Sequence, residues 1–331
     1  MVKSLKHIIL LYFSLNLLYP NNSINIITTN DMHGFINQQK ATFINPNFPP
    51  IIIGGSGYIK YVNDLRNIID DELLILDGGN FFQGHPLGII DRGRTMIDWM
   101  NIVGYDAIVP GANDFLFGID NLIDLSKQAD FEFLACNLFY KDSNNLIFEP
   151  YKIVEIKDIK IGIIGLANPD LESLVLSKNL KNVIMKNPID MLNNTVLELE
   201  NKADVIILLT SSGVPWDREE VYDNFINDII STNISEIPSN AIELGYYANG
   251  VDIIISGGIS KGYNRPWYDP NSHVYTFQNY GNGTSFGHFS INIDKQSKLF
   301  TGFDYKVKNS ISQTLFLHDF DFDQSYFDWI E

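Results

Sequence analysis

The sequence predicts an α/β fold in which a mostly parallel but mixed β-sheet is covered by helices. Short runs rich in Ile, Val and Leu alternate along the chain with longer amphipathic runs, which is typical of strands that alternate with helices. The segment YKIVEIKDIKIGIIG has the pattern of a β-hairpin instead, and such an antiparallel pair makes the sheet mixed. Five of the predicted strands end in short loops of glycine and polar residues. In open α/β sheets, ligands bind at the edge where the carboxyl ends of the strands lie.

The predicted elements follow one another in strand–loop–helix order. Apolar runs with the length and composition of buried strands lie at residues 24–28, 73–76, 107–110, 133–136, 160–166, 205–209 and 251–256. Apolar residues recur at helical spacing over residues 57–69, 95–103, 120–128, 189–202 and 219–231. There is no internal repeat and no low-complexity linker, so these elements are expected to form one domain, residues 23–308.

Composition excludes several classes of protein. With 45% hydrophobic and 13% aromatic residues among 331, the chain can bury a large core, which excludes an intrinsically disordered protein. Forty acidic against 23 basic residues give a net charge of −17. A surface this acidic repels nucleic acid and anionic lipid, so neither is expected as a partner. The single cysteine, Cys136, lies in the apolar run FEFLACNL, which predicts a buried thiol.

Residues 1–22 are predicted to be a signal peptide. Lys3, Lys6 and His7 precede the apolar run IILLYFSLNLLY, and polar PNNS follows it. The run is shorter than the roughly 20 residues of a membrane-spanning helix, so no stable span is expected. No small-residue cleavage site is evident, which leaves a retained N-terminal anchor as the alternative. The mature chain is therefore expected to be extracytoplasmic, either periplasmic or secreted.

Residues 309–331 are predicted to form an acidic, aromatic C-terminal tail. Asp and Phe alternate from Asp319 to Asp323, which favours an edge strand whose charges discourage further pairing. Docking of a partner is the alternative role for this tail.

The polar loops after the strands read TNDMHG, DGGNFFQG, PGANDFLFG, TSSGVP and SGGISKG. Because the carboxyl ends of the strands border one crevice, these loops are expected to converge on a single pocket. Asp31 and His33 stand one residue apart in the first loop, an arrangement with which metal sites often begin.

In this order the five loops resemble the motifs of the 5′-nucleotidase family of calcineurin-like metallophosphoesterases, which read DxHG, GDxxxG, GNHEF, TH and GGHxH. The resemblance covers about residues 24–305. It implies a sandwich of mixed β-sheets flanked by helices. It also implies a phosphoester hydrolase in which two divalent metals ~4 Å apart lower the pKa of a bridging water. The resemblance extends to the catalytic domain only, because the family's C-terminal domain, which holds the base, is not expected in this sequence.

The resemblance assigns the site positions one by one. Asp31 and His33 match the family's first metal ligands, and Asn80 stands where an aspartate bridges both metals. Asn113 takes the place of the catalytic histidine. The other ligand positions are also substituted, by Ala112, Ser211, Ile259 and Lys261. Five of the seven ligand positions are therefore changed, and the resemblance implies a degenerate dinuclear site.

Three hypotheses about function follow. The leading one is a protein that is catalytically weak or inactive and holds no metal tightly. One alternative is an active phosphoester hydrolase that uses a single Mn, Zn or Mg ion at Asp31, His33 and Asn80, with His85 as a recruited ligand or acid. The other is an envelope binding or scaffold protein, whose partner is a small phosphoester ligand or another envelope protein.

The same residues have structural interpretations. Asp31 is expected to cap backbone amides and His33 to fill a hydrogen-bonding position. Lys261 is either a solvated loop residue or, if it replaces the charge of a metal, an ion-pair partner of Asp31. Trp216 and residues 263–269 are expected at the rim of the pocket, where they stack on a ligand or pack against their own loops.

Overall fold

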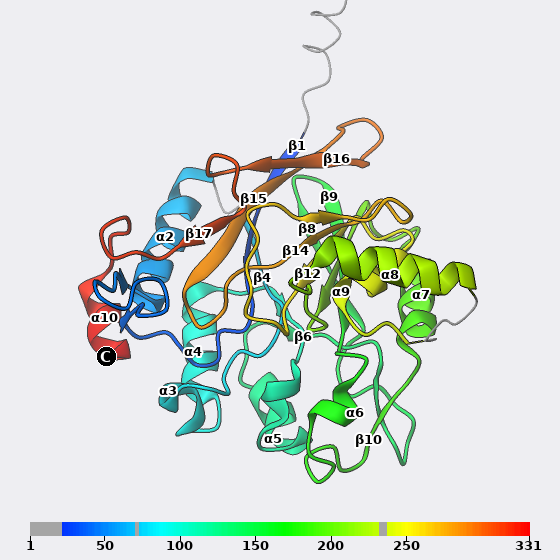
Figure 1. Ribbon diagram of the computed structural model, residues 1–331, viewed down its shortest axis with the longest axis horizontal. Helices are drawn as coiled ribbons and strands as arrows, with labels where there is room; N and C mark the ends of the chain where they lie inside the picture. Colours follow the sequence, from blue (N-terminus) through cyan, green and yellow to red (C-terminus); the bar gives the residue numbers. More distant parts are fainter. Residues whose placement is uncertain (1–21, 70–72, 232–236) are drawn as a thin grey trace, which may run out of the picture.

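Two mixed β-sheets pack face to face, and helices cover the outer face of each sheet (Figure 1). This is the architecture of a computed structural model that describes residues 22–69, 73–231 and 237–331. The predicted signal peptide, apart from Asn22, lies outside the described residues, and export of the protein stays a prediction. Among the described residues, no helix has the length and apolar character needed to cross a membrane.

The first sheet is parallel at its centre and antiparallel at one side. Its strands, in spatial order, are β16 (Phe300–Tyr305), β15 (Ser285–Ile293), β1 (Asn22–Thr29), β4 (Leu73–Asp77), β5 (Ala107–Ile108) and β6 (Glu132–Phe133), and β17 (Ser312–Thr314) also pairs with β15. The helices that pack on its outer face are α2 (Gly55–Ile69), α4 (Arg94–Val103), α5 (Ile119–Ser126) and α10 (Gln324–Ile330). Within this sheet β1, β4, β5 and β6 are parallel, and β15 runs antiparallel to β1.

The second sheet has the same mixed character. Its strands, in spatial order, are β13 (Trp267–Tyr268), β14 (Tyr275–Phe277), β12 (Ile253–Ser256), β11 (Val205–Thr210), β9 (Ile159–Leu166) and β8 (Tyr151–Ile156). On its outer side lie α7 (Pro188–Leu199), α9 (Ala241–Tyr247) and, against α9, α8 (Arg218–Ser231). Shorter elements connect these: β2 (Gln39–Lys40), β3 (Ile51–Ile52), α3 (Pro86–Ile89), the 3₁₀ turn η1 (Ala112–Phe115), β7 (Leu138–Tyr140), α6 (Leu171–Leu174) and β10 (Val183–Met185).

The strands of both sheets are buried on two sides. Ile26 and Leu76 of the first sheet pack against Ile207 of the second, and all three are fully buried. Alternate residues of the same strands, such as Ile27 and Ile75, face the helices instead. The expectation of one sheet with helices on both faces is therefore wrong. A continuous apolar run indicates burial on both faces, but it does not tell whether the second cover is a helix or another sheet. The sandwich that the resemblance implied is confirmed.

Most predicted elements are present, with boundaries shifted by a few residues. The hairpin is confirmed, because β8 and β9 pair in antiparallel register. The strand predicted at 133–136 is shorter, since only Glu132–Phe133 pair with β5. The chain then crosses to the second sheet, where the Cys136 N–H donates to the Gly165 carbonyl at 2.8 Å. The Cys136 thiol is buried as predicted, and burial raises its pKa to about 12.

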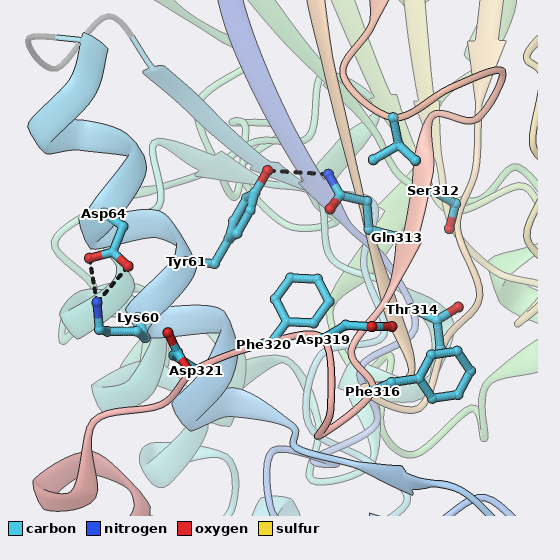
Figure 2. Close-up of a pocket in the computed structure, with 11 residues that line it drawn as sticks. Lys60, Tyr61, Asp64, Ser312, Gln313, Thr314, Phe316, Asp319, Phe320 and Asp321 are labelled. Carbon is cyan, nitrogen blue, oxygen red and sulfur yellow. Dashed lines mark hydrogen bonds and ion pairs between the residues drawn. The ribbon is translucent and has the colours of Figure 1, made fainter.

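The C-terminal tail is part of the first hydrophobic core. Phe320, Phe327 and Ile330 pack on the cluster that α2 and α4 form on the outer face of the first sheet. Figure 2 shows Phe320 beside Tyr61 of α2 and Phe316 beside Thr314, all of them lining an open cavity of about 560 Å³. The edge strand expected over Asp319–Asp323 is wrong. The alternating Phe side chains are half-buried against the core instead, and Asp323 caps α10 by accepting the Ser325 N–H at 2.8 Å.

One buried histidine in this core makes folding stability depend on pH. His288 on β15 is 3% exposed, and its ring nitrogens contact Tyr61 Oη at 2.7 Å and Asn25 Oδ1 at 3.2 Å. Burial lowers its pKa to about 4, and the charge of Lys306 adds to this. In the unfolded chain a histidine has a pKa of about 6.5. Its contribution to stability is therefore complete above pH 6.5 and is lost as the pH falls toward 4.

We expect wild-type protein to lose about 2 kcal/mol more unfolding free energy than the His288→Gln variant when the pH drops from 7.5 to 5.0. Glutamine has no charge to gain in this window and retains hydrogen-bonding groups. Burial raises the pKa of Asp252 to about 6, which has the opposite effect on stability, but this group is common to both proteins and cancels in the comparison. Urea unfolding at the two pH values measures the difference, and equal losses would contradict this role of His288.

Candidate functional site

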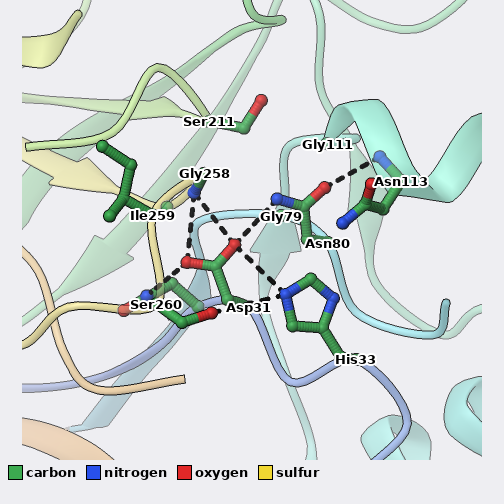
Figure 3. A network of polar contacts seen from close by, with 12 residues as sticks. Asp31, His33, Gly79, Asn80, Gly111, Asn113, Ser211, Gly258, Ile259 and Ser260 are labelled. Carbon is green, nitrogen blue, oxygen red and sulfur yellow. Dashed lines mark hydrogen bonds and ion pairs between the residues drawn. The ribbon is translucent and has the colours of Figure 1, made fainter. Parts of the chain in front are cut away.

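The loops after two neighbouring strands of each sheet meet at one site (Figure 3). Asp31 follows β1, Asn80 follows β4, Ser211 follows β11 and Ile259 follows β12. Asn113, in η1 after β5, joins the same group through the backbone N–H that it donates to the Asn80 side chain. Each strand ends where its apolar run meets a Gly-containing polar loop. Parallel strands then bring these loops to one edge of each sheet.

The Asp31 carboxylate is the buried centre of this site. The side chain is 1% exposed and accepts hydrogen bonds from Asn80 Nδ2 at 2.7 Å and from Asn30 Nδ2 at 2.9 Å. The backbone N–H of Gly258 donates to both of its oxygens, at 3.0 and 3.1 Å. A carboxylate with this number of donors is satisfied within the protein, and hydrogen bonds to a charged group are the stronger kind.

Asn80 connects two loops through its amide. Its Nδ2 donates to Asp31, and its Oδ1 accepts the backbone N–H of Asn113 at 3.0 Å. An aspartate at this position has no N–H to donate, and its second oxygen would face the Asp31 carboxylate. The packing is tight, because a Cβ on Gly111 would lie 2.2 Å from Asn80 Oδ1. The asparagine therefore joins the loop of Asp31 to the turn of Asn113 by hydrogen bonds, whereas metal ions join the corresponding loops in the family that the sequence resembles.

His33 has one tautomer that fits its contacts. Nδ1 lies 2.9 Å from the Gln83 carbonyl oxygen, which only accepts, so Nδ1 carries the proton. The lone pair of Nε2 then faces Ser260 Oγ at 3.4 Å and lies 3.9 Å from Asp31 Oδ1. This tautomer suits a metal ligand, and it equally suits acceptance of a hydrogen bond from the serine.

A second buried carboxylate, Asp114, holds two of these loops together by accepting hydrogen bonds from their backbone. It accepts backbone N–H groups of Asn80 and Gly111 at 2.8 Å each, and that of Phe82 at 3.4 Å. Burial raises its pKa to about 7, although these hydrogen bonds act in the opposite direction. Asp77 at the end of β4 is also fully buried, and burial raises its pKa well above the usual value. Asp114 thus holds the backbone of Asn80 in place, and its oxygens are used by backbone N–H groups.

Two of the substituted positions, Ser211 and Ile259, lie on the side of the site that the second sheet forms, and Ala112 stands beside Asn113 in η1 (Figure 3). Ala112 and Ile259 carry no donor atom for a metal. Ser211 does have a hydroxyl, which is buried and has no hydrogen-bond partner among the described residues. Asn113 is exposed at the surface of its turn. Neither serine nor asparagine side chains are strong ligands for Mn²⁺ or Zn²⁺.

Lys261 does not lie at the metal position. Its ammonium group stands 4.1 Å from the centre of the Trp216 ring and 5.7 and 5.9 Å from those of Tyr263 and Tyr280. Within residues 22–69, 73–231 and 237–331 it forms no ion pair with Asp31, so of the two interpretations drawn from the sequence, the pairing with Asp31 is wrong. A lysine stem is long enough to follow aromatic surface away from its backbone, and the Asp31 carboxylate already has its donors.

The backbone N–H of His85 donates to the His33 carbonyl at 2.7 Å, but its side chain makes other contacts. It caps α3, where Nδ1 accepts the Leu87 N–H at 3.4 Å, and its ring packs on Phe35 with 4.8 Å between centroids. Burial lowers its pKa. The recruitment of His85 as a ligand or acid is thus not supported by these contacts.

The sequence analysis missed residues that hold the site together. Asn30 donates to Asp31 and exchanges hydrogen bonds with the backbone of Asn279 at 2.8 and 3.0 Å. Ser260 and Gly258 contact His33 and Asp31 as described above. The signal was present for Ser260 and Gly258, because both stand in the last family motif beside substituted ligands. Asn279 has no such signal, since it follows β14 of the second sheet and meets Asn30, after β1 of the first sheet, only through the packing of the two sheets.

The residues present do not fit a pair of divalent metals. Two dications need a bridging carboxylate and several imidazole or carboxylate ligands. Here the strong donors are one carboxylate, Asp31, and one imidazole, His33. Nowhere in the described part of the chain do three His, Cys, Asp or Glu side chains come together in a metal-binding group. The donor set is that of a hydrogen-bonded polar cluster.

Comparisons with known proteins relate the chain to phosphoesterases. It is 28% identical to protein UshA of Salmonella pullorum over 196 residues, which are 57% of this chain and 34% of UshA. It is 28% identical to 5′-nucleotidase of Bos taurus over 202 residues, 59% of this chain and 35% of that protein. The chain thus spans about a third of the length of these curated relatives. No family profile matches it.

A solved structure has the same fold over nearly all of both chains. The calcineurin-like phosphoesterase YfkN of Bacillus subtilis superposes with a TM-score of 0.68. The superposition covers 94% of this chain and 99% of that one, at 20% sequence identity. At this identity the likeness shows the fold alone.

Proposed function

Because the chain is a relative of the 5′-nucleotidase family of calcineurin-like phosphoesterases, we propose that it is a catalytically weak or inactive member with a degenerate dinuclear site. The observation that carries this proposal is the hydrogen bond from Asn80 to Asp31. An amide N–H occupies the space between two side chains that, in a dinuclear enzyme, a metal ion would join. The Asp31 carboxylate is satisfied by donors of the protein itself.

The chemistry of phosphoester hydrolysis supports the same proposal. In a two-metal site the ions bind the phosphate, lower the pKa of a bridging water and stabilise the leaving oxygen. The charge of two ions at ~4 Å separation is offset by a bridging carboxylate. Asn80 cannot supply that charge, and Asn113 has no group that titrates near neutral pH in place of the catalytic histidine. This chain keeps the backbone of the site without the groups that do the chemistry.

We expect purified protein to hold well under one equivalent of Mn²⁺ or Zn²⁺ and to hydrolyse para-nitrophenyl phosphate barely above background. Elemental analysis after dialysis and a phosphate-release assay with added metal measure the two quantities. The matched control is the Asp31→Ala variant, which should not change either value. Two tightly held metals, or a turnover that Asp31→Ala abolishes, would contradict the proposal.

A second candidate is a hydrolase with one metal. The observation in its favour is the His33 tautomer, whose free Nε2 lone pair lies near Asp31 Oδ1. This candidate predicts one equivalent of metal and a turnover that both His33→Ala and Asp31→Ala remove. The metal stoichiometry therefore separates the two candidates.

A further inference from the structure

A separate cavity opens beside the polar site. Its volume is about 470 Å³, which falls within the range of small-molecule pockets. Its apolar walls are Phe43, Ile44, Trp216 and Tyr280, and polar atoms come from Ser260 and Thr284. We refer to it as the aromatic pocket. Ser260 links it to the site through its contact with His33.

The aromatic walls of the pocket are exposed. Trp216 is 66% exposed and Phe43 is 65% exposed, while Tyr280 is 40% exposed. Large apolar side chains that gather on one concave surface mark a binding site more often than scattered ones do. Aromatic side chains bury much area when a flat ligand covers them. The side chains of this pocket are therefore available to a ligand.

A positive charge stands at the same aromatic rings. Lys261 Nζ lies 4.1 Å from the centre of the Trp216 ring and 5.9 Å from that of Tyr280. No ion pair to Lys261 is formed by any of the described residues, although the chain as a whole carries a net charge of −17. Lys261 does not itself line the cavity, but its ammonium stands over two of the rings that do. An unpaired ammonium in this position favours an anionic group over a neutral or cationic one.

We propose that the aromatic pocket binds a small organic anion, one with a flat apolar or aromatic body and a carboxylate or phosphate at one end. The body would lie against Trp216, Tyr280 and Phe43, and the anionic group would lie toward Lys261. Ser260 and Thr284 offer hydrogen bonds to polar atoms between the two ends. This inference stands apart from the metal chemistry, since none of these contacts uses Asp31 or Asn80.

The test uses three probes of one shape on the full chain. 2-Naphthoate and 2-naphthyl phosphate are the anions, which separate a carboxylate from a phosphate, and 2-naphthamide is the neutral analogue. Isothermal titration calorimetry measures their affinities. We expect both anions to bind more tightly than the amide. Lys261→Gln should weaken the anions about fivefold and leave the amide unchanged, and Trp216→Ala should weaken all three about tenfold.

Two matched variants control for non-specific effects. Lys186 also stands over an aromatic ring, 3.6 Å from the centre of Phe139, and Trp329 is also exposed, at 45%. Neither lines the aromatic pocket, so Lys186→Gln and Trp329→Ala should change no affinity. Equal losses in these controls would overturn the proposal, and so would an absence of binding for all three probes.

Two further outcomes would assign the pocket differently. Equal affinity for the amide and the anions, with no effect of Lys261→Gln, would make it a purely apolar pocket and overturn the anion assignment. Self-association in sedimentation velocity that Trp216→Ala abolishes, without probe binding, would assign the aromatic surface to a second copy of the chain and overturn the small-molecule assignment.

Discussion

Replacing Asn80 by aspartate is expected to make folding of this protein depend on a divalent metal. The substitution removes the Nδ2 donor that lies 2.7 Å from Asp31 and places a second carboxylate there, with both side chains almost fully buried. Two carboxylates at this distance cannot both ionise without a cation, so one pKa of the pair rises strongly. We expect the unfolding free energy at pH 8 to fall by about 3 kcal/mol or more in the presence of a chelator.

Addition of Mn²⁺ should recover much of that loss, because the new carboxylate, together with Asp31 and His33, offers three strong donors to one ion. Thermal unfolding with and without Mn²⁺ measures the effect, and the same metal should change wild-type stability little. The Asn80→Ala variant is the control. It also loses the hydrogen bonds to Asp31 and Asn113, but it adds no charge, so metal should not rescue it. Rescue of both variants, or of neither, would mean that position 80 does not correspond to the bridging ligand.

Deleting residues 318–331 is expected to destabilise the protein by about 4 kcal/mol or more, measured by urea unfolding. The reason is that Phe320 contacts Tyr61 and Phe286, with ring centroids 5.7 and 5.9 Å apart, and Ile330 is 5% exposed. Removing the segment uncovers this part of the core, which α2 and α4 also form.

The matched control keeps the aromatic residues and removes only charge. Asp319, Asp321 and Asp328 are exposed, so their combined change to asparagine should alter stability by roughly 0.5 kcal/mol or less. If instead the deletion leaves stability unchanged, the segment is a peripheral tail, as its composition suggested. A docking role would then be the better interpretation.

Much of the site could be predicted from the sequence because its residues are local to motifs. Asp31 and His33 stand in one short loop. A loop that follows a parallel strand lies at the edge of the sheet where the carboxyl ends of its neighbours also lie. The substitutions at Ala112 and Ile259 could also be identified, since they stand at fixed offsets from glycines that keep the register. For Asn80 and Asp31, the sequence could predict that the two residues lie near each other but not that they form a hydrogen bond. That the amide donates to the carboxylate and replaces a metal contact depends on the direction of one side chain, which sequence spacing does not give.

The long-range arrangement was harder to predict. Strand periodicity does not distinguish a helix from a second sheet as the cover of a buried face, so the sandwich followed from the resemblance and not from the apolar pattern. Alternating Asp and Phe in the tail suggested a strand, because that pattern says which residues are apolar but not which surface receives them. Lys261 was placed at the metal because its position in the motif is fixed, whereas its ammonium lies at the end of a flexible stem.

By itself, the sequence determined the α/β composition, the order of most strands and helices as far as β12, and the set of loops at the site, whereas the later strands such as β15 were not predicted. The features that it determined depend on local pattern and on residue identity, which the chain carries directly. Only the tertiary structure decided that two sheets face each other, that the tail completes the core, that Asn80 satisfies Asp31, and that Lys261 joins Trp216 beside a cavity. Each of these is a contact between segments far apart in the chain, and its geometry is set by how all the layers pack together and not by any one segment.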